Sequence, residues 1–276
     1  MKRVSIIGLG WLGMPLGLTL AARGWQVQGS RTTPDGVEAA RLCGLAGYQL
    51  VMTPELICQP EALDALMQAD ALVITLPATR TVSESGAYLS AVQQLVDSAR
   101  AYHIPHIIFT SSTSVYGQCE GGVDENHVTE PQTTAGKTLV ELESWLHGLP
   151  DIKVDVLRLA GLVGPQRHPG RFLAGRQELT MANQAVNLVH LDDVIEAIAT
   201  LLESSRGGHV YNLCAPHHPS RGTYYPRVAL QLGLTPPEFL PAENESTGKI
   251  VDGNRICREL GFTYKYSDLY VMSQSS

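Results

Sequence analysis

The sequence predicts an α/β protein built on a doubly wound parallel sheet, with a small additional lobe formed mainly by its C-terminal part. Short apolar runs rich in β-branched residues alternate with amphipathic, helix-like segments through the first half of the chain, and this pattern is typical of repeated strand–helix–strand units. A glycine-rich turn separates the first run from the first helix. The length of 276 residues fits one large domain with a smaller lobe.

The glycine-rich turn organises the first strand and helix. A strand is expected at residues 4–7, and Gly8, Gly10 and Gly13 follow it as a G-x-G-x-x-G motif. These glycines allow a tight turn, a close approach of the backbone to a pyrophosphate, and close packing of helix on strand. The free N–H groups at the start of the helix favour a pair of phosphates. We therefore predict a Rossmann-type dinucleotide-binding unit. The residues predicted to contact the cofactor here are Gly8, Gly10, Trp11, Leu12 and Gly13.

The end of the second strand, expected at about residues 25–29, indicates which dinucleotide binds. An acid placed about 20 residues after the glycines would bind the ribose 2′-hydroxyl of NAD. Here the chain has Ser30, Arg31 and Thr32, and no acid occurs before Asp35. Hydroxyls and a guanidinium can bind a 2′-phosphate that a carboxylate would repel. We predict NADP(H) as the preferred cofactor, with NAD(H) as the alternative.

The following segments continue the α/β alternation. Helices are expected at about residues 35–45, 61–68 and 87–102, and strands at about 48–52, 71–75 and 106–110. Ligands of a parallel sheet bind beyond the carboxyl ends of its strands. Leu76, Pro77 and Ala78 directly follow the strand at 71–75, so we expect them to contact the cofactor.

Composition and charge argue against several functional classes. The net charge of −7 is unlike that of a general nucleic-acid binder. No apolar run approaches the roughly 20 residues of a membrane span, and the first strand begins almost at once, so we expect a cytoplasmic protein without membrane association. The five cysteines form no C-x-x-C pair and no metal-ligating cluster stands out, so no metal site is expected.

The stretch at residues 109–117 carries a family resemblance. It reads F-T-S-S-T-S-V-Y-G and resembles the fifth-strand motif of extended short-chain dehydrogenases/reductases. In that family, a serine four residues before the V-Y-G tyrosine polarises the substrate's carbonyl or hydroxyl, and Ser112 matches it. The resemblance also implies that Thr110 and Ser111 lie beside the cofactor. Further matching segments occur at residues 156–165, 187–194, 210–213 and 258–262.

Two departures from the family pattern bear on function. The family usually carries G-x-x-G-x-x-G at its first turn, whereas this chain carries G-x-G-x-x-G. Lys137 matches the lysine of the family's Y-x-x-x-K motif, which holds the nicotinamide ribose, but Thr133 replaces the tyrosine. A threonine hydroxyl is a far weaker acid than a phenol whose pKa is lowered by a nearby lysine. The pattern is similar to atypical members of the family, and the whole chain closely resembles their YeeZ-like group, which has no settled substrates.

The missing tyrosine leaves three candidates for the catalytic acid or base. They are Tyr116, Thr133 acting through water, and the loop after residue 165. In this loop Arg167, His168 and Arg171 form a basic cluster that suits a phosphate or carboxylate of a substrate. The catalytic residues that we predict are Ser112, Lys137 and Tyr116.

The proposed domain boundaries follow from these assignments. Residues 1–165 and about 187–214 are assigned to an NAD(P)-binding Rossmann domain, and about 166–186 and 215–276 to a small substrate-binding lobe. His190 is interpreted as a buried, hydrogen-bonding histidine. Asp192 and Asp193 are expected to cap a helix that begins near Val194. The last ten residues are expected to be poorly ordered.

Three functions remain open at this point. The first is an NAD(P)-dependent oxidoreductase or epimerase that acts on a polar small molecule, with nucleotide-linked compounds among the candidates. The second is a dinucleotide-binding sensor or regulatory protein without catalysis, which the missing tyrosine favours. The third follows from residues 8–15, which also resemble β-hydroxyacid dehydrogenases, although strand-like segments at 154–159 and 208–213 argue against the largely helical C-terminal domain of that family. The resemblance to extended members further implies a homodimer that pairs through helices at about 87–102 and 135–147.

Overall fold

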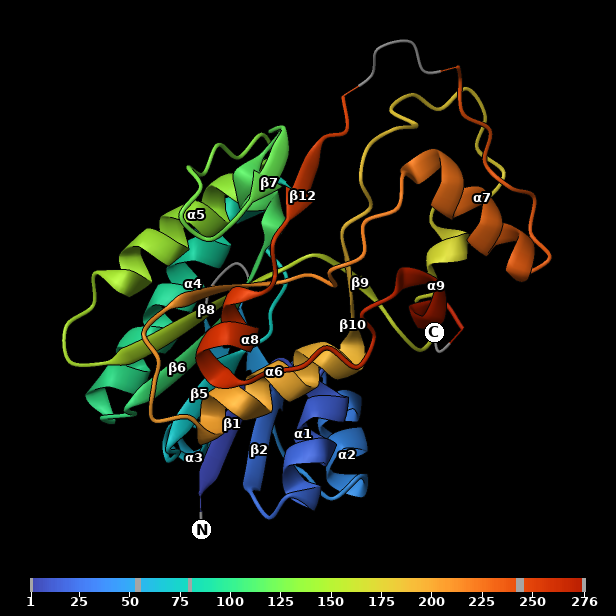
Figure 1. Cartoon of the computed structure of the whole chain (residues 1–276). Helices are drawn as coiled ribbons and strands as arrows, with labels where there is room; N and C mark the ends of the chain where they lie inside the picture. Colours follow the sequence, from blue (N-terminus) through green and yellow to red (C-terminus); the bar gives the residue numbers. More distant parts are fainter. Residues whose placement is uncertain (1, 53–55, 79–80, 242–245, 275–276) are drawn as a thin grey trace. The chain divides into compact units, whose positions relative to one another are not determined.

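The computed structural model describes residues 2–52, 56–78, 81–241 and 246–274 (Figure 1). Its strands are β1 (Arg3–Ile7), β2 (Gln26–Arg31), β3 (Ala46–Val51), β4 (Ile57–Cys58), β5 (Ala71–Ile74), β6 (His106–Ser112), β7 (Gly121–Val123), β8 (Lys153–Leu159), β9 (Gly161–Val163), β10 (Leu188–His190), β11 (Val210–Leu213) and β12 (Lys249–Val251). Its α-helices are α1 (Gly13–Ala22), α2 (Pro34–Leu42), α3 (Pro60–Met67), α4 (Val82–Ala101), α5 (Thr134–His147), α6 (Leu191–Glu203), α7 (Arg221–Gln231), α8 (Arg255–Leu260) and α9 (Leu269–Met272). Two short 3₁₀ turns are η1 (Thr113–Tyr116) and η2 (Pro169–Arg171).

The central sheet has eight strands in the order β11-β8-β6-β5-β1-β2-β3-β4. β1 pairs in parallel with β2 and β5, β2 with β3, and β5 with β6, whereas β4 runs antiparallel to β3. The chain builds outward from β1 to β3 and then returns to the other side of β1, which makes the sheet doubly wound. The predicted fold class is therefore confirmed. Because the strand order reverses between β1 and β5, their carboxyl ends form the crevice where this class binds ligands.

The chain divides into two compact units. The first comprises Met1–Val115, Pro131–Leu157 and Ile198–Val210, and the second comprises Tyr116–Glu130, Arg158–Ala197 and Tyr211–Ser276. The glycine turn, the ends of β2, β5 and β6, and the whole of α5 belong to the first unit. The loop after β9 and the polar cluster around Tyr116 belong to the second. The division into a cofactor domain and a substrate lobe stays a prediction.

Burial explains why the first unit folds as predicted. Every residue of β5 is buried, and so are all residues of β1 after Arg3, as expected for central parallel strands that are covered on both faces. α1 and α2 lie next to β1 and β2 (Figure 1). α4 buries a stripe at helical spacing, made of Tyr88, Ala91, Val92, Leu95, Val96 and Ala99. α4 packs against α5.

The second unit has its own smaller elements and core. β9 pairs in parallel with β10, and β7 pairs in parallel with β12. These short strands, and the two-residue β4, are too short to show a hydrophobic period, so the sequence does not predict them. The core of this unit combines residues from β9, α7 and the C-terminal segment, among them Val163, Tyr224 and Leu269.

The expectation of a poorly ordered C-terminus is wrong for the described residues up to 274. Leu269 and Met272 of α9 are fully buried, and the hydroxyl of Tyr224 donates a hydrogen bond to the carbonyl of Leu269 at 3.2 Å. Asp268 caps α9 by accepting a hydrogen bond from the N–H of Tyr270. The expectation is wrong because it rested on the terminal position of the segment. The apolar side chains of the segment pack into the core and order it.

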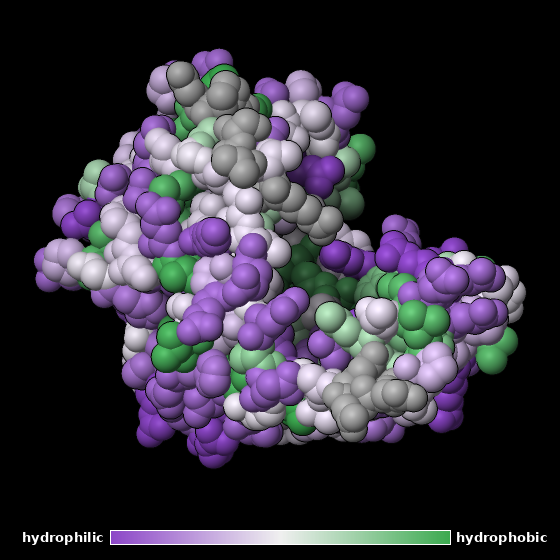
Figure 2. All heavy atoms as spheres, turned by 90° about the horizontal axis from the view of Figure 1, so that it is seen from above, coloured by the Kyte–Doolittle hydropathy of each residue, from purple (hydrophilic) through white to green (hydrophobic). Residues whose placement is uncertain are grey.

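The surface is polar with scattered apolar residues. Hydrophilic residues cover most of the face seen in Figure 2, and apolar patches on it are small. The exposed residues of α4 and α5 include the polar Ser90, Gln94, Asp97, Glu141 and Ser144. Pairing of two copies through these helices stays a prediction. Within the described ranges, each helix is too short or too polar to span a bilayer.

Candidate functional site

The glycine turn after β1 has the backbone that its sequence predicts. Gly8 has a φ of +103°, which residues with a side chain rarely adopt. A Cβ on Gly13 would overlap the carbonyl oxygen of Gly8, so α1 can begin this close to β1 only with glycine there. A Cβ on Gly10, in contrast, would meet no atom within 4 Å. The fold therefore requires two of the glycines and leaves the third beside open space, where a ligand's phosphates can approach the backbone.

The start of α1 offers hydrogen-bond donors to such a ligand. Leu12 occupies the N-cap position, and its side chain makes no capping hydrogen bond. The first turn holds no acidic residue either. An N-terminus without a capping side chain or a negative charge suits an anion. Because Leu12 is buried, it can contact a cofactor through its backbone, whereas Trp11 is half-buried.

The three residues at the end of β2 that are predicted to select NADP(H) differ in burial and in their contacts. Ser30 is only 2% exposed, and its hydroxyl accepts a hydrogen bond from the N–H of Gly8 at 3.1 Å. It therefore supports the glycine turn from inside. Arg31 is half-buried and donates from Nη1 to the carbonyl of Leu9, while Thr32 is exposed. Of the three residues, Arg31 and Thr32 are the ones whose side chains reach the surface beside the turn.

The end of β5 contributes two residues that the sequence does not single out. The hydroxyl of Thr75 donates to the carbonyl of Gly8 at 2.7 Å, so it supports the glycine turn from this side. The hydroxyl of Tyr88 on α4 donates to the carbonyl of Leu76 at 3.0 Å. Burial raises the pKa of Tyr88, so the phenol stays protonated and keeps this bond at physiological pH. Tyr88 thereby fixes the start of the Leu76–Ala78 segment, in which Pro77 is exposed.

The end of β6 turns two predicted cofactor residues toward the protein interior. The buried hydroxyl of Thr110 donates to the carbonyl of Ile74 at 3.0 Å, and that of Ser111 donates to Glu143 of α5 at 2.5 Å. Their side chains therefore join β6 to β5 and to α5, which leaves only backbone contacts to a cofactor. Ser112 is half-buried, and its Oγ accepts a hydrogen bond from the N–H of Ser114 at 3.1 Å. This bond orients the Ser112 hydroxyl and leaves its proton for another acceptor.

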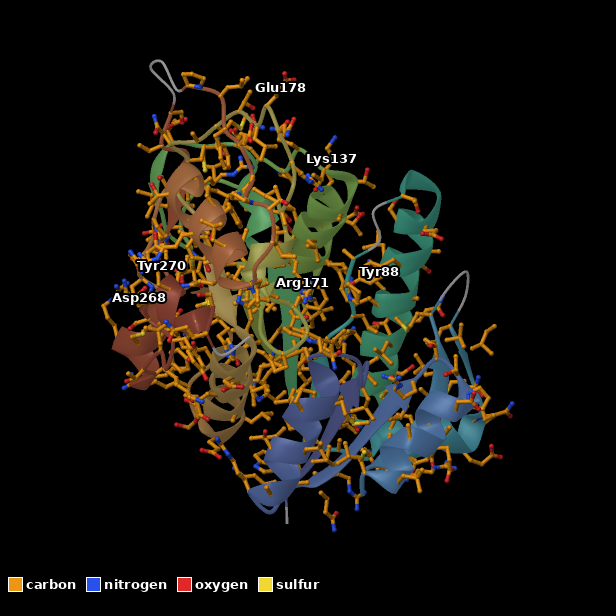
Figure 3. All side chains as sticks on the ribbon, turned by 90° about the vertical axis from the view of Figure 1, so that its right-hand side faces the viewer. Tyr88, Lys137, Arg171, Glu178, Asp268 and Tyr270 are labelled. Atoms are coloured by element: carbon orange, nitrogen blue, oxygen red, sulfur yellow. The ribbon has the colours of Figure 1, made fainter. Side chains whose placement is uncertain are left out.

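α5 carries the remaining catalytic candidates of the first unit. Thr133 is the N-cap residue of α5, with φ −100° and ψ 154°, and its hydroxyl accepts a hydrogen bond from the N–H of Gly136 at 3.1 Å. Residue 133 therefore lies just outside the helix and has a capping role. Lys137 is exposed, and its side chain extends away from the first turns of α5 (Figure 3).

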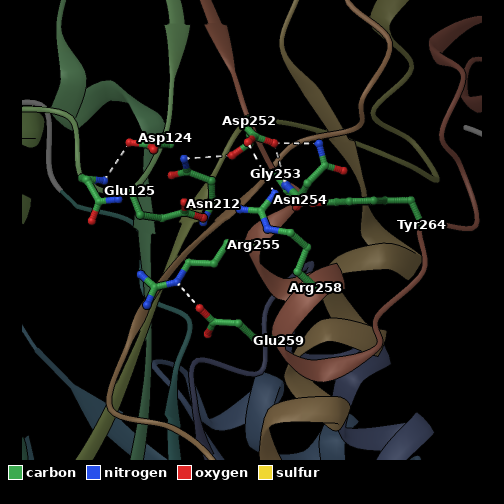
Figure 4. A network of polar contacts seen from close by, with 11 residues as sticks. Asp124, Glu125, Asn212, Asp252, Gly253, Asn254, Arg255, Arg258, Glu259 and Tyr264 are labelled. Carbon is green, nitrogen blue, oxygen red and sulfur yellow. Dashed lines mark hydrogen bonds and ion pairs between the residues drawn. The ribbon is translucent and has the colours of Figure 1, made fainter.

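Tyr116 belongs to a buried polar cluster in the second unit. Its hydroxyl donates to Oδ1 of Asn212 at 2.7 Å and accepts from Nη1 of Arg158 at 2.8 Å. Asn212 is held in turn by Glu125, which accepts from its backbone N–H at 2.8 Å, and by the carbonyl of Asp252 at 3.1 Å (Figure 4). Burial raises the pKa of Tyr116, although the adjacent guanidinium acts in the opposite direction. These contacts favour a structural role for Tyr116 over that of a proton donor.

The basic loop after β9 splits into one buried and two exposed residues. His168 is 7% exposed, and its Nδ1 accepts a hydrogen bond from the N–H of Gly170 at 2.9 Å. Burial lowers the pKa of His168, which keeps the ring neutral at physiological pH. His168 thus shapes the loop, while Arg167 and Arg171 are exposed, and Arg171 is labelled in Figure 3. Anion binding by the two arginines stays a prediction.

The helix after His190 begins earlier than the sequence predicts. α6 begins at Leu191, not near Val194, so Asp192 and Asp193 lie inside its first turn. The carboxylate of Asp193 accepts backbone N–H bonds from Lys265 at 2.7 Å and Tyr266 at 3.2 Å. His190 is buried as expected, and its Nδ1 accepts a hydrogen bond from the N–H of Asp192 at 3.1 Å. Asp193 therefore anchors the C-terminal segment. Both aspartates lie inside α6 instead of capping it.

The sheet and the glycine turn together define the class of fold. A doubly wound sheet with a glycine turn at the point where its strand order reverses is a Rossmann-type dinucleotide fold. Across the described residues, no group of three or more His, Cys, Asp or Glu side chains is arranged to hold a metal ion. Residues 10–214 match the family model for the NAD dependent epimerase/dehydratase family, and the chain therefore belongs to that family.

Individual relatives agree with this assignment. Protein YeeZ of Escherichia coli strain K12 is 60% identical over 272 residues, which cover 99% of each chain. MoeE5, solved in complex with UDP-glucose and NAD, is 21% identical with a TM-score of 0.78 over 99% of this chain and 96% of that one. A short-chain dehydrogenase/reductase superfamily protein from Agrobacterium tumefaciens with bound NAD is 17% identical, with a TM-score of 0.80 over 99% and 95% of the chains. The similarity to YeeZ confirms the resemblance seen in the sequence, and the two structures confirm the fold.

The alternative resemblance to β-hydroxyacid dehydrogenases is not supported. It implies a largely helical C-terminal half, whereas β8 and β11 are strands of the central sheet. The glycine turn alone is common to both families, so it does not separate them.

The environment of Asp193 predicts a pH dependence of stability. Burial raises the pKa of Asp193 to about 6 from its model-compound value of 3.8, and the two backbone N–H bonds only partly oppose this. The folded state then binds the Asp193 proton more tightly than the unfolded state, so this stabilisation is complete below pH 4 and is lost as the pH rises to 6. Relative to Asp193→Asn, the wild-type free energy of unfolding should fall by on the order of 3 kcal/mol across this interval. Urea denaturation at several pH values measures the free energy of unfolding of both proteins. A difference between wild type and Asp193→Asn that does not change with pH would contradict the prediction.

Proposed function

We propose that this protein binds NADP(H) at the glycine turn and uses it in an oxidation, reduction or epimerisation of a polar, nucleotide-linked small molecule. The observation that carries this proposal is the open position at Gly10, set between two glycines that the fold requires. A cradle of backbone atoms that admits no side chain at Gly8 and Gly13 fits a pyrophosphate. Family membership supports a nicotinamide dinucleotide, and MoeE5, solved with UDP-glucose and NAD, supports the substrate class.

The candidate residues have different roles in the proposed reaction. When bound, a nicotinamide dinucleotide supplies a hydride acceptor or donor. Ser112, held at the end of β6 by the N–H of Ser114, would donate its hydroxyl proton to a substrate oxygen and stabilise the charge that develops there. Lys137 would hold the nicotinamide ribose and add positive charge beside it. Arg167 and Arg171 of the second unit would bind a phosphate of the substrate.

The two candidate functions differ in whether the protein has a group that transfers a proton. Thr133 caps α5, and Tyr116 both donates to Asn212 and accepts from Arg158. Neither hydroxyl resembles the activated phenol that the family motif supplies. This observation favours a second candidate function, in which the protein binds the dinucleotide as a sensor or regulatory partner and turns over no substrate.

A substitution at Gly10 tests the position of the cofactor. Gly10→Val places a branched side chain in the open space of the turn, so NADPH affinity should fall by about tenfold or more. The fold should survive because a Cβ at this position meets no neighbour within 4 Å. Fluorescence titration measures binding, and circular dichroism monitors the fold. Gly86→Val is the matched control, since Gly86 of α4 also faces open space but lies far along the chain from the turn. Unchanged binding by Gly10→Val would place the cofactor elsewhere.

A substitution at Arg31 tests the choice of NADP(H). Removing the guanidinium in Arg31→Ala should weaken NADPH binding by about tenfold, because a charge-assisted bond to the 2′-phosphate is lost. NADH carries no such phosphate, so its affinity should not change. Arg41→Ala, on the exposed side of α2, is the control. Equal affinities of the wild-type protein for the two cofactors would contradict the NADP(H) preference.

Turnover variants test the active-site assignment once a substrate is found by ligand screening with NADPH present. Ser112→Ala should lower kcat/KM by roughly a hundredfold, because it removes a donor to a charged substrate oxygen. Lys137→Met should also reduce it. Thr133→Ser keeps the capping oxygen and should remain near wild type. If Ser112→Ala and Lys137→Met retain wild-type activity, the assignment is wrong. If NADPH binds tightly and no nucleotide-linked substrate is turned over, the sensor function is favoured.

A further inference from the structure

Arg31 is the last residue of β2, and its side chain contacts both the glycine turn and α2. It runs across the first turn of α2, and its Nη1 donates a hydrogen bond to the carbonyl of Leu9 in the glycine turn. A Cβ built on Gly36 of α2 would lie 2.6 Å from Nε of Arg31 and 3.3 Å from its Cβ. Arg31 therefore occupies the space that a side chain at position 36 would need.

The backbone of α2 does not itself require glycine at position 36. Gly36 is absent from the residues with positive φ, and its N–H donates to the capping hydroxyl of Thr33 at 3.2 Å as any residue could. Glycine is a poor residue in the body of a helix, where alanine is preferred. The reason for glycine here must therefore come from packing. Two of the three nearest neighbours of the missing Cβ are atoms of Arg31, and the third belongs to Thr33.

The path of Arg31 determines what its guanidinium can reach. The bond to Leu9 holds the group beside the glycine turn, at the end of the second strand, where this class places the adenine ribose of its cofactor. Among the described residues, Arg31 makes no other hydrogen bond, so Nη2 is available to a phosphate oxygen. A guanidinium fixed in this position binds a phosphate with less loss of side-chain freedom than a mobile one.

We propose that Gly36 is a specificity-determining position, which allows Arg31 to lie across α2 and so sets the preference for NADPH over NADH. This inference rests on the proposed binding of NADP(H). Any side chain at position 36 displaces Arg31 from the glycine turn. The one atom within 3.0 Å of this Cβ, Nε of Arg31, belongs to a flexible side chain, so its displacement leaves the fold intact.

The experiment compares Gly36→Ala, Arg31→Ala and the double variant by fluorescence titration with NADPH and with NADH. Gly36→Ala should lose about tenfold in NADPH affinity, as expected for a displaced charge-assisted contact. Its NADH affinity should stay the same, and its thermal unfolding temperature should stay the same or rise. The double variant should bind NADPH no more weakly than Arg31→Ala, because position 36 acts only through Arg31. Gly86→Ala, a helical glycine beside open space, is the matched control.

A second measurement follows Arg31 directly without any cofactor. In ¹⁵N-labelled protein, the Nε–H resonance of Arg31, assigned by its absence from Arg31→Ala, should shift in Gly36→Ala and not in Gly86→Ala. An NADPH preference that survives in Gly36→Ala, or an additive loss in the double variant, would overturn the inference while the proposed function stands. Equal binding of both cofactors by the wild type would overturn the NADP(H) preference and this inference together, whereas loss of all dinucleotide binding would overturn the proposed function itself.

Discussion

The backbone of Gly8 is held from both neighbouring strands, and the position of α1 depends on this arrangement. Its N–H donates to the hydroxyl of Ser30 at the end of β2, and its carbonyl accepts from the hydroxyl of Thr75 just after β5. The turn at the edge of a buried strand thus has its polar groups satisfied. With the carbonyl of Gly8 fixed, α1 can begin only where residue 13 lacks a Cβ. The shape of the glycine turn, where we propose that phosphates bind, is therefore a consequence of three adjacent strands and not of the glycines alone.

Side-chain hydroxyls also hold the protein in place along the carboxyl edge of the sheet in the first unit. Tyr88, Thr110 and Ser111 all carry hydroxyls that suit a ligand, and all three bind other parts of the protein. Their bonds fix the ends of β5 and β6 so that the backbone there is rigid. Among the described residues of this edge, two keep a donor for a ligand. Ser112 keeps a proton to donate, and Arg31 keeps Nη2 beside the glycine turn.

Much of this arrangement could be predicted from the sequence, because periodicity and glycine spacing report directly on buried strands and tight turns. The first strands and helices, the role of Gly13 and the fold class were all predicted in this way. The direction of a polar side chain is different, because it depends on neighbours that are distant in the chain. Ser30 and His168 were predicted to face ligands, and both are buried with backbone partners. Tyr88 and Thr75 were not singled out, since a tyrosine on an apolar helical stripe and a threonine at a strand end are unremarkable in sequence.

The replacement of the family tyrosine is best understood from the start of α5. The family motif places tyrosine and lysine four residues apart in one helix, where both side chains share a face. Here the helix begins at Thr134, and Thr133 has an extended backbone with its hydroxyl turned to the N–H of Gly136. A tyrosine at this position would lack the short hydroxyl that caps the helix, and it would not stand within the helix above Lys137. Thr133 therefore marks a different local structure and not a single exchanged side chain, so any proton transfer here must follow a route other than the tyrosine–lysine pair.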